Sequence, residues 1–232
     1  FYTASILSLA LIFITNHFLF KKDIAPEPPA IAVKAPETEN KVPAAESQPD
    51  AVLSSQAAVA AFPHTDISSP ALTGSFRTRG FRIDNLWLEK YKQTLSPDSP
   101  DVELLSPAKT ANPYYAEFGW LAANASIRLP NADTPWNVKG NKLTPDTPVV
   151  LEWENGQGLK FITKISLDQN YMFTVSQAVE NNTGSNVTLY PYGLIARSPA
   201  AIGSRSVVHE GMVGVMDATL KEIKYDDLEK EN

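Results

Sequence analysis

Residues 149–167, VVLEWENGQGLKFITKISL, decide the fold class. Apolar side chains alternate with polar ones on both sides of the central ENGQG, a pattern typical of two half-buried β-strands. The Asn155-Gly156 pair supplies the positive φ angles that a tight reversal of the chain requires. The stretch therefore predicts a β-hairpin.

Other short segments rich in Val, Ile, Thr, Tyr and Phe predict further strands. We expect two more strand pairs and one single strand: 75–79 with 82–91, 171–179 with 187–195, and 114–120. Long apolar stripes with the 3.6-residue period of helices are missing from these segments. Because short strands joined by turns form sandwiches or barrels rather than parallel α/β sheets, the sequence predicts a mostly β fold.

Composition divides the chain into three zones. Residues 1–22 begin with twenty positions that lack Asp, Glu, Lys and Arg, and at about 1.5 Å per residue these positions predict a transmembrane helix. Residues 23–73 are rich in Pro, Ala and Glu and predict a disordered linker. All 11 glycines and all four tryptophans lie in residues 74–232, the expected folded domain.

The membrane span has two alternatives, a cleaved signal peptide and a buried core helix. The apolar run is longer than a typical signal-peptide core, and no A-x-A cleavage site directly follows Lys21 and Lys22. These two lysines alone would favour a cytoplasmic location for the rest of the chain. The span is therefore expected to anchor the chain, with its orientation open on charge alone.

Charge and cysteine content exclude several functions. With 26 acidic and 20 basic side chains, the chain has no broad positive field for nucleic acid. The absence of cysteine excludes disulfides, thiolate nucleophiles and sulfur-ligated zinc, and it fits a reducing compartment or a bacterial periplasm.

Catalytic motifs are also missing. Among three histidines, only His209 falls in the expected domain, and its neighbour Glu210 would point to the opposite face of a strand. No Gly-rich phosphate loop, G-x-S-x-G elbow or H-E-x-x-H motif is present. We therefore expect no enzyme, no cofactor and no metal site.

Aromatic residues give the best candidates for a binding site. Residues 114–120 and 189–193 are rich in Tyr and could line a groove for a sugar or an extended peptide. Core packing is the more common use of aromatic side chains in strands. The candidate cleft residues are Tyr114, Tyr115, Trp120, Tyr190, Tyr192 and His209.

Seven blocks of sequence, taken in order, resemble the bacterial YidC branch of the YidC/Oxa membrane protein insertases, in its alphaproteobacterial form. The blocks are RIDNL (82–86), YYAEFGW (114–120), LTPDTP (143–148), LEWENG (151–156), NYMFTV (170–175), LYPYGLIAR (189–197) and HEG (209–211). The resemblance implies a first transmembrane helix with a cytoplasmic N-terminus, followed by a periplasmic domain. That domain has a β-supersandwich fold similar to galactose mutarotases, and the resemblance implies that residues 74–232 are a part of it truncated at the C-terminal end.

The same resemblance implies a function and partners. Proteins of this family help to insert, fold and assemble inner-membrane proteins, with or without the Sec translocon. The implied partners are nascent inner-membrane proteins, the Sec translocon with its SecDF subunits, and the lipid bilayer around the N-terminal helix. The alternative is a carbohydrate-binding or mutarotase-like periplasmic module, because a shared fold does not fix a function.

Overall fold

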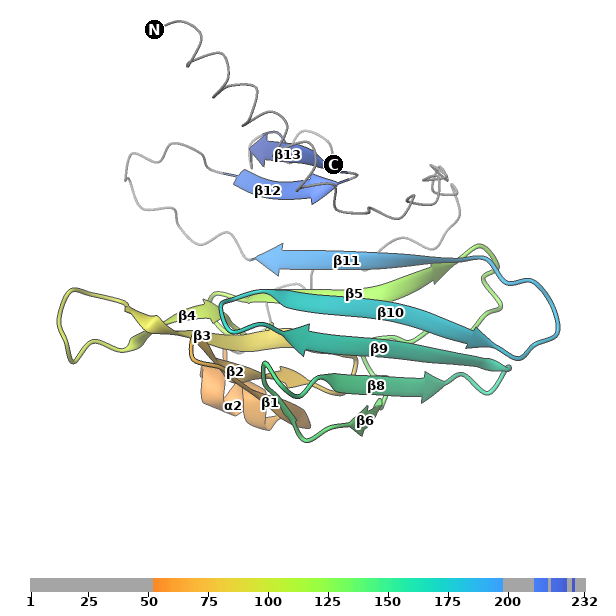
Figure 1. The fold of residues 1–232 in the computed structure, drawn as a ribbon, viewed down its shortest axis with the longest axis horizontal. Coiled ribbons are helices and arrows are strands. Elements are labelled where there is room, and N and C mark those ends of the chain that lie inside the picture. The colour runs from red at the N-terminus through yellow and green to blue at the C-terminus, as the bar shows by residue number, and fades with distance from the viewer. Residues whose placement is uncertain (1–51, 198–210, 217, 225–226, 228–232) are drawn as a thin grey trace, which may run out of the picture. The chain divides into compact units, whose positions relative to one another are not determined.

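The computed structural model describes residues 52–197, 211–216, 218–224 and 227 (Figure 1). Most of this part consists of β-strands, in which successive side chains point to opposite faces. One short helix, α2, spans Ser55–Ala60. The strands are β1 His64–Ser68, β2 Leu72–Arg77, β3 Arg82–Lys92, β4 Asp101–Leu105, β5 Tyr114–Ala122, β6 Asn137–Lys139, β7 Lys142–Leu143, β8 Val149–Glu154, β9 Leu159–Leu167, β10 Phe173–Asn181, β11 Leu189–Arg197, β12 Gly211–Met216 and β13 Thr219–Lys224. The expected mostly β fold is confirmed.

The strands form three sheets. A seven-stranded sheet has the order β11-β5-β3-β2-β1-β7, with β4 paired to β3. A four-stranded sheet has the order β10-β9-β8-β6, and β12 pairs with β13 in a separate hairpin. Neighbouring strands are antiparallel except β1 and β7, which pair in parallel.

One core lies between the seven-stranded and the four-stranded sheets. Phe76, Leu86 and Trp120 of the first sheet and Leu151 and Phe161 of the second belong to the same buried cluster. The rings of Trp120 and Phe161 meet edge to face, with their centroids 5.1 Å apart. Side chains that alternate along each strand therefore point either into this core or to the outer face of their sheet.

The predicted hairpin at residues 149–167 is confirmed. β8 and β9 pair from Val149 with Ile165 to Glu154 with Lys160. The buried Asn155 shapes the reversal, because its side-chain oxygen accepts hydrogen bonds from the backbone of Gln157 at 2.7 Å and Leu159 at 3.1 Å.

The other predicted strands are present, but one pairing is wrong. β2 and β3 form the expected antiparallel pair. β10 and β11 do not pair with each other, because β10 pairs with β9 and β11 pairs with β5. The turn-rich residues 181–186 connect β10 in one sheet to β11 in the other. The polar residues therefore predicted a reversal of the chain correctly, but they did not show which strand β11 pairs with.

The predicted boundary between linker and domain is also wrong. α2, β1 and the start of β2 lie in residues 55–73, which composition assigned to the disordered linker. β1 is stabilised by β2 on one edge and β7 on the other, and it buries Thr65 and Ile67. β1 has only five residues and one large apolar side chain, and it is flanked by Pro63 and Pro70. The amino-acid composition averaged over the surrounding segment therefore does not reveal it. Residues 23–51 of the expected linker lie outside the described residues.

The expected membrane span at residues 1–22 likewise lies outside the described residues. Within the ranges that are described, no helix has the length and apolar character needed to cross a bilayer.

Candidate functional site

A row of charged side chains crosses the outer face of the seven-stranded sheet. Arg77 on β2 lies opposite Arg82 on β3, and Arg82 lies opposite Glu117 on β5. All three are buried although they point away from the core. Part of the cover over Arg77 comes from α2 and residues 107–109, and the Phe62 ring centroid lies 4.5 Å from the Arg77 guanidinium carbon. The part of this face around these three residues is therefore charged and shielded from water at the same time.

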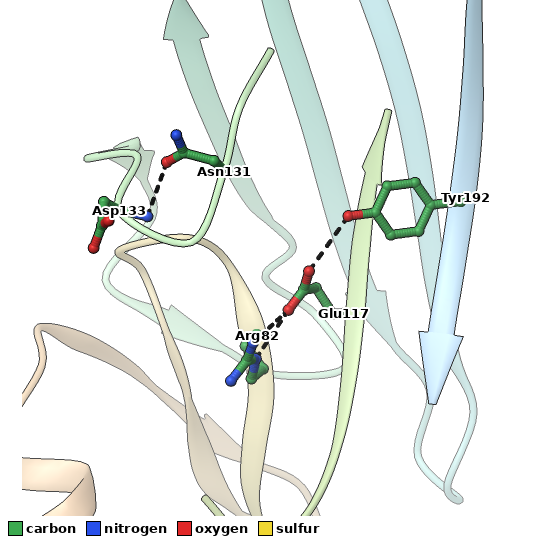
Figure 2. A network of polar contacts seen from close by, with 5 residues as sticks. All are labelled: Arg82, Glu117, Asn131, Asp133 and Tyr192. Carbon is green, nitrogen blue, oxygen red and sulfur yellow. Dashed lines mark hydrogen bonds and ion pairs between the residues drawn. The ribbon is translucent and has the colours of Figure 1, made fainter. Parts of the chain in front are cut away.

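An ion pair forms the centre of the row. Arg82 donates from Nη2 and Nε to Glu117 Oε2, at 2.6 Å and 3.1 Å. The Tyr192 hydroxyl donates to Glu117 Oε1 at 3.3 Å, so the carboxylate lies between the two side chains (Figure 2). The Arg82 guanidinium carbon also lies 4.0 Å from the ring centroid of Tyr115. These contacts connect β3, β5 and β11 across the outer face.

The Tyr192 ring packs directly against Gly119, where the absence of a side chain leaves room for it. The two residues are opposite each other in the β5–β11 register, and a Cβ added at Gly119 would lie 2.6 Å from the ring. Burial, followed by the negative charge of Glu117, raises the pKa of the Tyr192 phenol above its ordinary value, while Arg82 opposes the shift. Tyr192 therefore remains a protonated hydrogen-bond donor.

The polar groups of this arrangement bind one another. Both Glu117 oxygens already accept hydrogen bonds, and the described residues contain no cluster of three His, Cys, Asp or Glu side chains that could hold a metal. His64 is exposed at the start of β1, where its ring nitrogen lies 3.3 Å from the Phe62 carbonyl oxygen.

The candidate cleft residues do not share one groove. Tyr115, Tyr190 and Tyr192 lie on the outer face of the seven-stranded sheet, where Tyr115 is buried and the other two are half-buried. Trp120 points into the core and is only 5% exposed, so core packing is the correct interpretation for this residue. Tyr114 alternates with Tyr115 and points to the opposite face of β5. His209 lies outside the described residues.

A cavity lies beside Tyr114 on β5. Tyr114 and Arg197 border a cavity of about 310 Å³ together with Gln93, Glu103 and Asn112.

A second cavity, of about 190 Å³, lies under α2 on the outer face of the seven-stranded sheet, where Arg77, Asp84 and Lys109 border it. The Asn131 side-chain oxygen accepts a hydrogen bond from the backbone of Asp133 at 2.9 Å, in the loop that brings Asp133 to the rim (Figure 2).

Arg82 and Glu117 were missed by sequence reasoning. Arg82 is the first residue of the block RIDNL, and Glu117 lies inside the block YYAEFGW, whose other residues are mainly apolar. A charged side chain in a strand that is covered on both faces must be paired with an opposite charge. The opposite charges of Arg82 and Glu117 could therefore have indicated a buried ion pair. Their mutual register was not available, because β3 and β5 are separated by β4 and its flanking loops.

Comparison with known proteins identifies the family. A family model described as the YidC periplasmic domain matches residues 64–232. A membrane protein insertase YidC from Methylobacterium nodulans is 48% identical over 187 residues, covering 79% of this chain and 31% of the relative. The corresponding protein from Rickettsia bellii is 39% identical over 226 residues, covering 97% of this chain and 40% of the relative. The chain thus spans well under half the length of these relatives. It belongs to the YidC membrane protein insertases, which are not enzymes, as the periplasmic domain region of an inner-membrane protein.

Proposed function

We propose that this chain anchors and presents the periplasmic domain of a protein that inserts, folds and assembles inner-membrane proteins. The observation that carries the proposal is the match of the family model over residues 64–232, together with relatives that are named membrane protein insertases. Residues 1–22 would form the membrane span, with the N-terminus in the cytoplasm, and residues 23–51 would connect it to the domain. The domain itself would be part of a β-supersandwich of the galactose mutarotase type.

Insertion needs no covalent step. A polar segment that enters hydrocarbon loses its hydrogen bonds with water, at a cost of several kcal/mol for each unsatisfied group. An insertase reduces this cost by offering a polar path across the bilayer. In this scheme the periplasmic domain contributes binding, and its partners are nascent inner-membrane proteins and the Sec translocon with SecDF.

The outer face of the seven-stranded sheet is the surface best suited to such partners. Its half-buried tyrosines, Tyr190 and Tyr192, combine apolar rings with a hydroxyl group. Tyr and Arg are enriched in protein interfaces, whereas Lys and Glu are depleted. The outer face of the four-stranded sheet instead carries Lys139, Glu152 and Lys160 in ion pairs.

Depletion of the protein that contains this chain tests the insertase proposal. Insertion of newly made inner-membrane proteins is followed by their protection from protease added to the periplasmic side. We expect insertion of at least some clients to fall and to recover when the protein is supplied again. Unchanged insertion of all clients after complete depletion would contradict the proposal.

One observation favours carbohydrate binding as a second candidate function. The cavity of about 310 Å³ combines the Tyr114 ring with amide, carboxylate and guanidinium groups, which can hold a sugar ring by stacking and hydrogen bonds. Calorimetric titration with neutral monosaccharides and oligosaccharides tests this candidate. Binding that is lost in Tyr114→Ala and retained in Tyr190→Ala would support it, and absence of heat with every sugar would count against it.

A further inference from the structure

The turn between β8 and β9 contains the only Asn-Gly pair in the chain, Asn155-Gly156. Glycine places no side chain beside the preceding asparagine and allows many backbone conformations. In a flexible chain, the backbone nitrogen of Gly156 can therefore reach the side-chain carbon Cγ of Asn155. An attack at this carbon begins deamidation, which converts the asparagine amide to a carboxylate.

The folded turn holds the Asn155 side chain in hydrogen bonds that oppose this attack. An asparagine amide has two donor and two acceptor positions, and all of them are used here. Nδ2 donates to the Arg128 carbonyl oxygen at 3.1 Å and to Gln157 Oε1 at 3.3 Å. Oδ1 accepts from the backbone nitrogens of Gln157 at 2.7 Å and Leu159 at 3.1 Å. Asn155 is only 2% exposed, so water has little access to the amide.

Two loops from other parts of the chain keep the turn in this conformation. Gln157 Nε2 donates to the Ser126 carbonyl oxygen at 3.1 Å, and Gln157 Oε1 accepts from the backbone nitrogen of Arg128 at 2.7 Å. From the β10–β11 connection, the backbone nitrogen of Asn182 donates to the Gly158 carbonyl oxygen at 2.8 Å. Further protein packed against the turn would only increase its shielding.

We propose that Asn155 is a deamidation site that folding keeps inert and that unfolding makes reactive. In the unfolded chain, the Gly156 backbone nitrogen loses its proton and bonds to Asn155 Cγ. The Cγ–Nδ2 bond then breaks, and Nδ2 takes up a proton and leaves as ammonia. Water adds to either carbonyl carbon of the resulting cyclic imide, one C–N bond breaks, and the backbone nitrogen regains a proton. The product is aspartate or isoaspartate, and the net reaction consumes one water molecule and releases one ammonia.

Neither product fits the folded turn. Aspartate at position 155 has no N–H group, so its carboxylate faces two other acceptors, the Arg128 carbonyl oxygen and Gln157 Oε1. Isoaspartate lengthens the backbone by one carbon next to the pairing of Glu154 with Lys160. Chemical change of an unfolded chain makes its unfolding irreversible. Deamidation at this position therefore keeps an unfolded chain from refolding, whichever partners the domain binds.

The test compares the full chain, folded in detergent micelles and unfolded in urea, at the same mildly alkaline pH. Water enriched in heavy oxygen marks only the carboxylates that form during the incubation, and mass spectrometry of peptides locates them. In urea we expect Asn155 to convert faster than Asn182, an exposed asparagine followed by Thr183. Folding should slow conversion of Asn155 by roughly tenfold or more and that of Asn182 far less. Equal rates at Asn155 in the two conditions, with tryptophan fluorescence showing one sample folded and the other unfolded, would overturn the proposal.

The effect on refolding is tested with Asn155→Asp, which carries the aspartate product from the start. The matched control is Asn182→Asp, which makes the same chemical change at an exposed position. After dilution from urea, we expect a lower yield of folded chain for Asn155→Asp than for the native chain, and a native yield for Asn182→Asp. Equal yields for the two variants would contradict the claim that deamidation at Asn155 blocks refolding.

Discussion

The ion pairs on the outer face of the four-stranded sheet are partly open to water, whereas the Arg82–Glu117 pair on the outer face of the seven-stranded sheet is buried. Lys139 and Glu180, at the two ends of the ion-pair series on the first face, have side chains 59% and 55% exposed. Arg82 and Glu117 on the second face have side chains 4% and 10% exposed. These two groups of ion pairs thus lie in different environments.

The burial of an ion pair determines whether it fixes the geometry of its neighbours. Exposed ion pairs are screened by water and salt and contribute little to stability. A buried pair gains strong attraction but loses hydration, so it fixes the geometry of its neighbours rather than adding much net stability. The Arg82–Glu117 pair therefore holds β3, β5 and Tyr192 in one arrangement, whereas the Lys139–Glu152 pair on the other face is partly exposed.

Removal of the buried carboxylate should have the largest effect. Glu117→Ala removes the buried carboxylate that pairs with Arg82, and we expect the free energy of unfolding to fall by about 3–5 kcal/mol. Urea denaturation followed by tryptophan fluorescence measures this loss. Lys139→Ala, which breaks an exposed pair, should leave the unfolding midpoint unchanged.

A double variant sharpens the same comparison. Arg82→Met combined with Glu117→Leu replaces the pair by apolar side chains of similar size, and it should recover most of the stability that Glu117→Ala loses. Equal losses of unfolding free energy in Glu117→Ala and Lys139→Ala would show that the buried and the exposed ion pairs contribute alike.

An intermediate effect is expected at Gly119. In Gly119→Ala the added methyl group meets the Tyr192 ring and displaces it from Glu117, at a cost of about 1–3 kcal/mol. Gly193→Ala, on the neighbouring strand, meets the Phe118 ring at an ordinary distance of 3.4 Å and is the matched control. The two unfolding curves are compared under the same conditions, and coincident midpoints would contradict the close contact between Gly119 and Tyr192.

The smallest effect is expected for Tyr192→Phe, which should cost about 1 kcal/mol at neutral pH through loss of one hydrogen bond. This difference depends on pH. Because the folded-state pKa is raised, the contribution of the phenol is complete below about pH 10 and is lost as the unfolded chain releases its proton above that pH. The stability gap between the native chain and Tyr192→Phe should therefore narrow above about pH 10. A gap that stays constant in urea titrations from about pH 8 to pH 11 would contradict the raised pKa.

Local patterns predicted the strands better than their partners. The hairpin at residues 149–167 was predictable because its alternation and its Asn-Gly turn lie within nineteen residues. The separation of β10 from β11 was not, because a polar turn allows a strand to return to the same sheet or to cross to the other. β1 was hidden for a similar reason, since its stability comes from β2 and β7 rather than from its own composition.

The candidate site was predicted only in part. Tyr115 and Tyr192 do lie on one face, yet alternation along β5 sends Tyr114 and Trp120 to the other. The sequence blocks that indicated the family contain Arg82 and Glu117, but their pairing depends on the register between β3 and β5. Aromatic content alone could not separate core positions from surface positions.

Photocrosslinking in native membranes tests most directly whether the outer face of the seven-stranded sheet binds partners. A photoreactive amino acid is placed at Tyr190 on this face and, as the matched control, at Lys164 on the outer face of the four-stranded sheet. We expect adducts with Sec translocon subunits, SecDF or nascent membrane proteins at position 190 and few or none at position 164. Equal adducts at both positions, or adducts only at position 164, would contradict it.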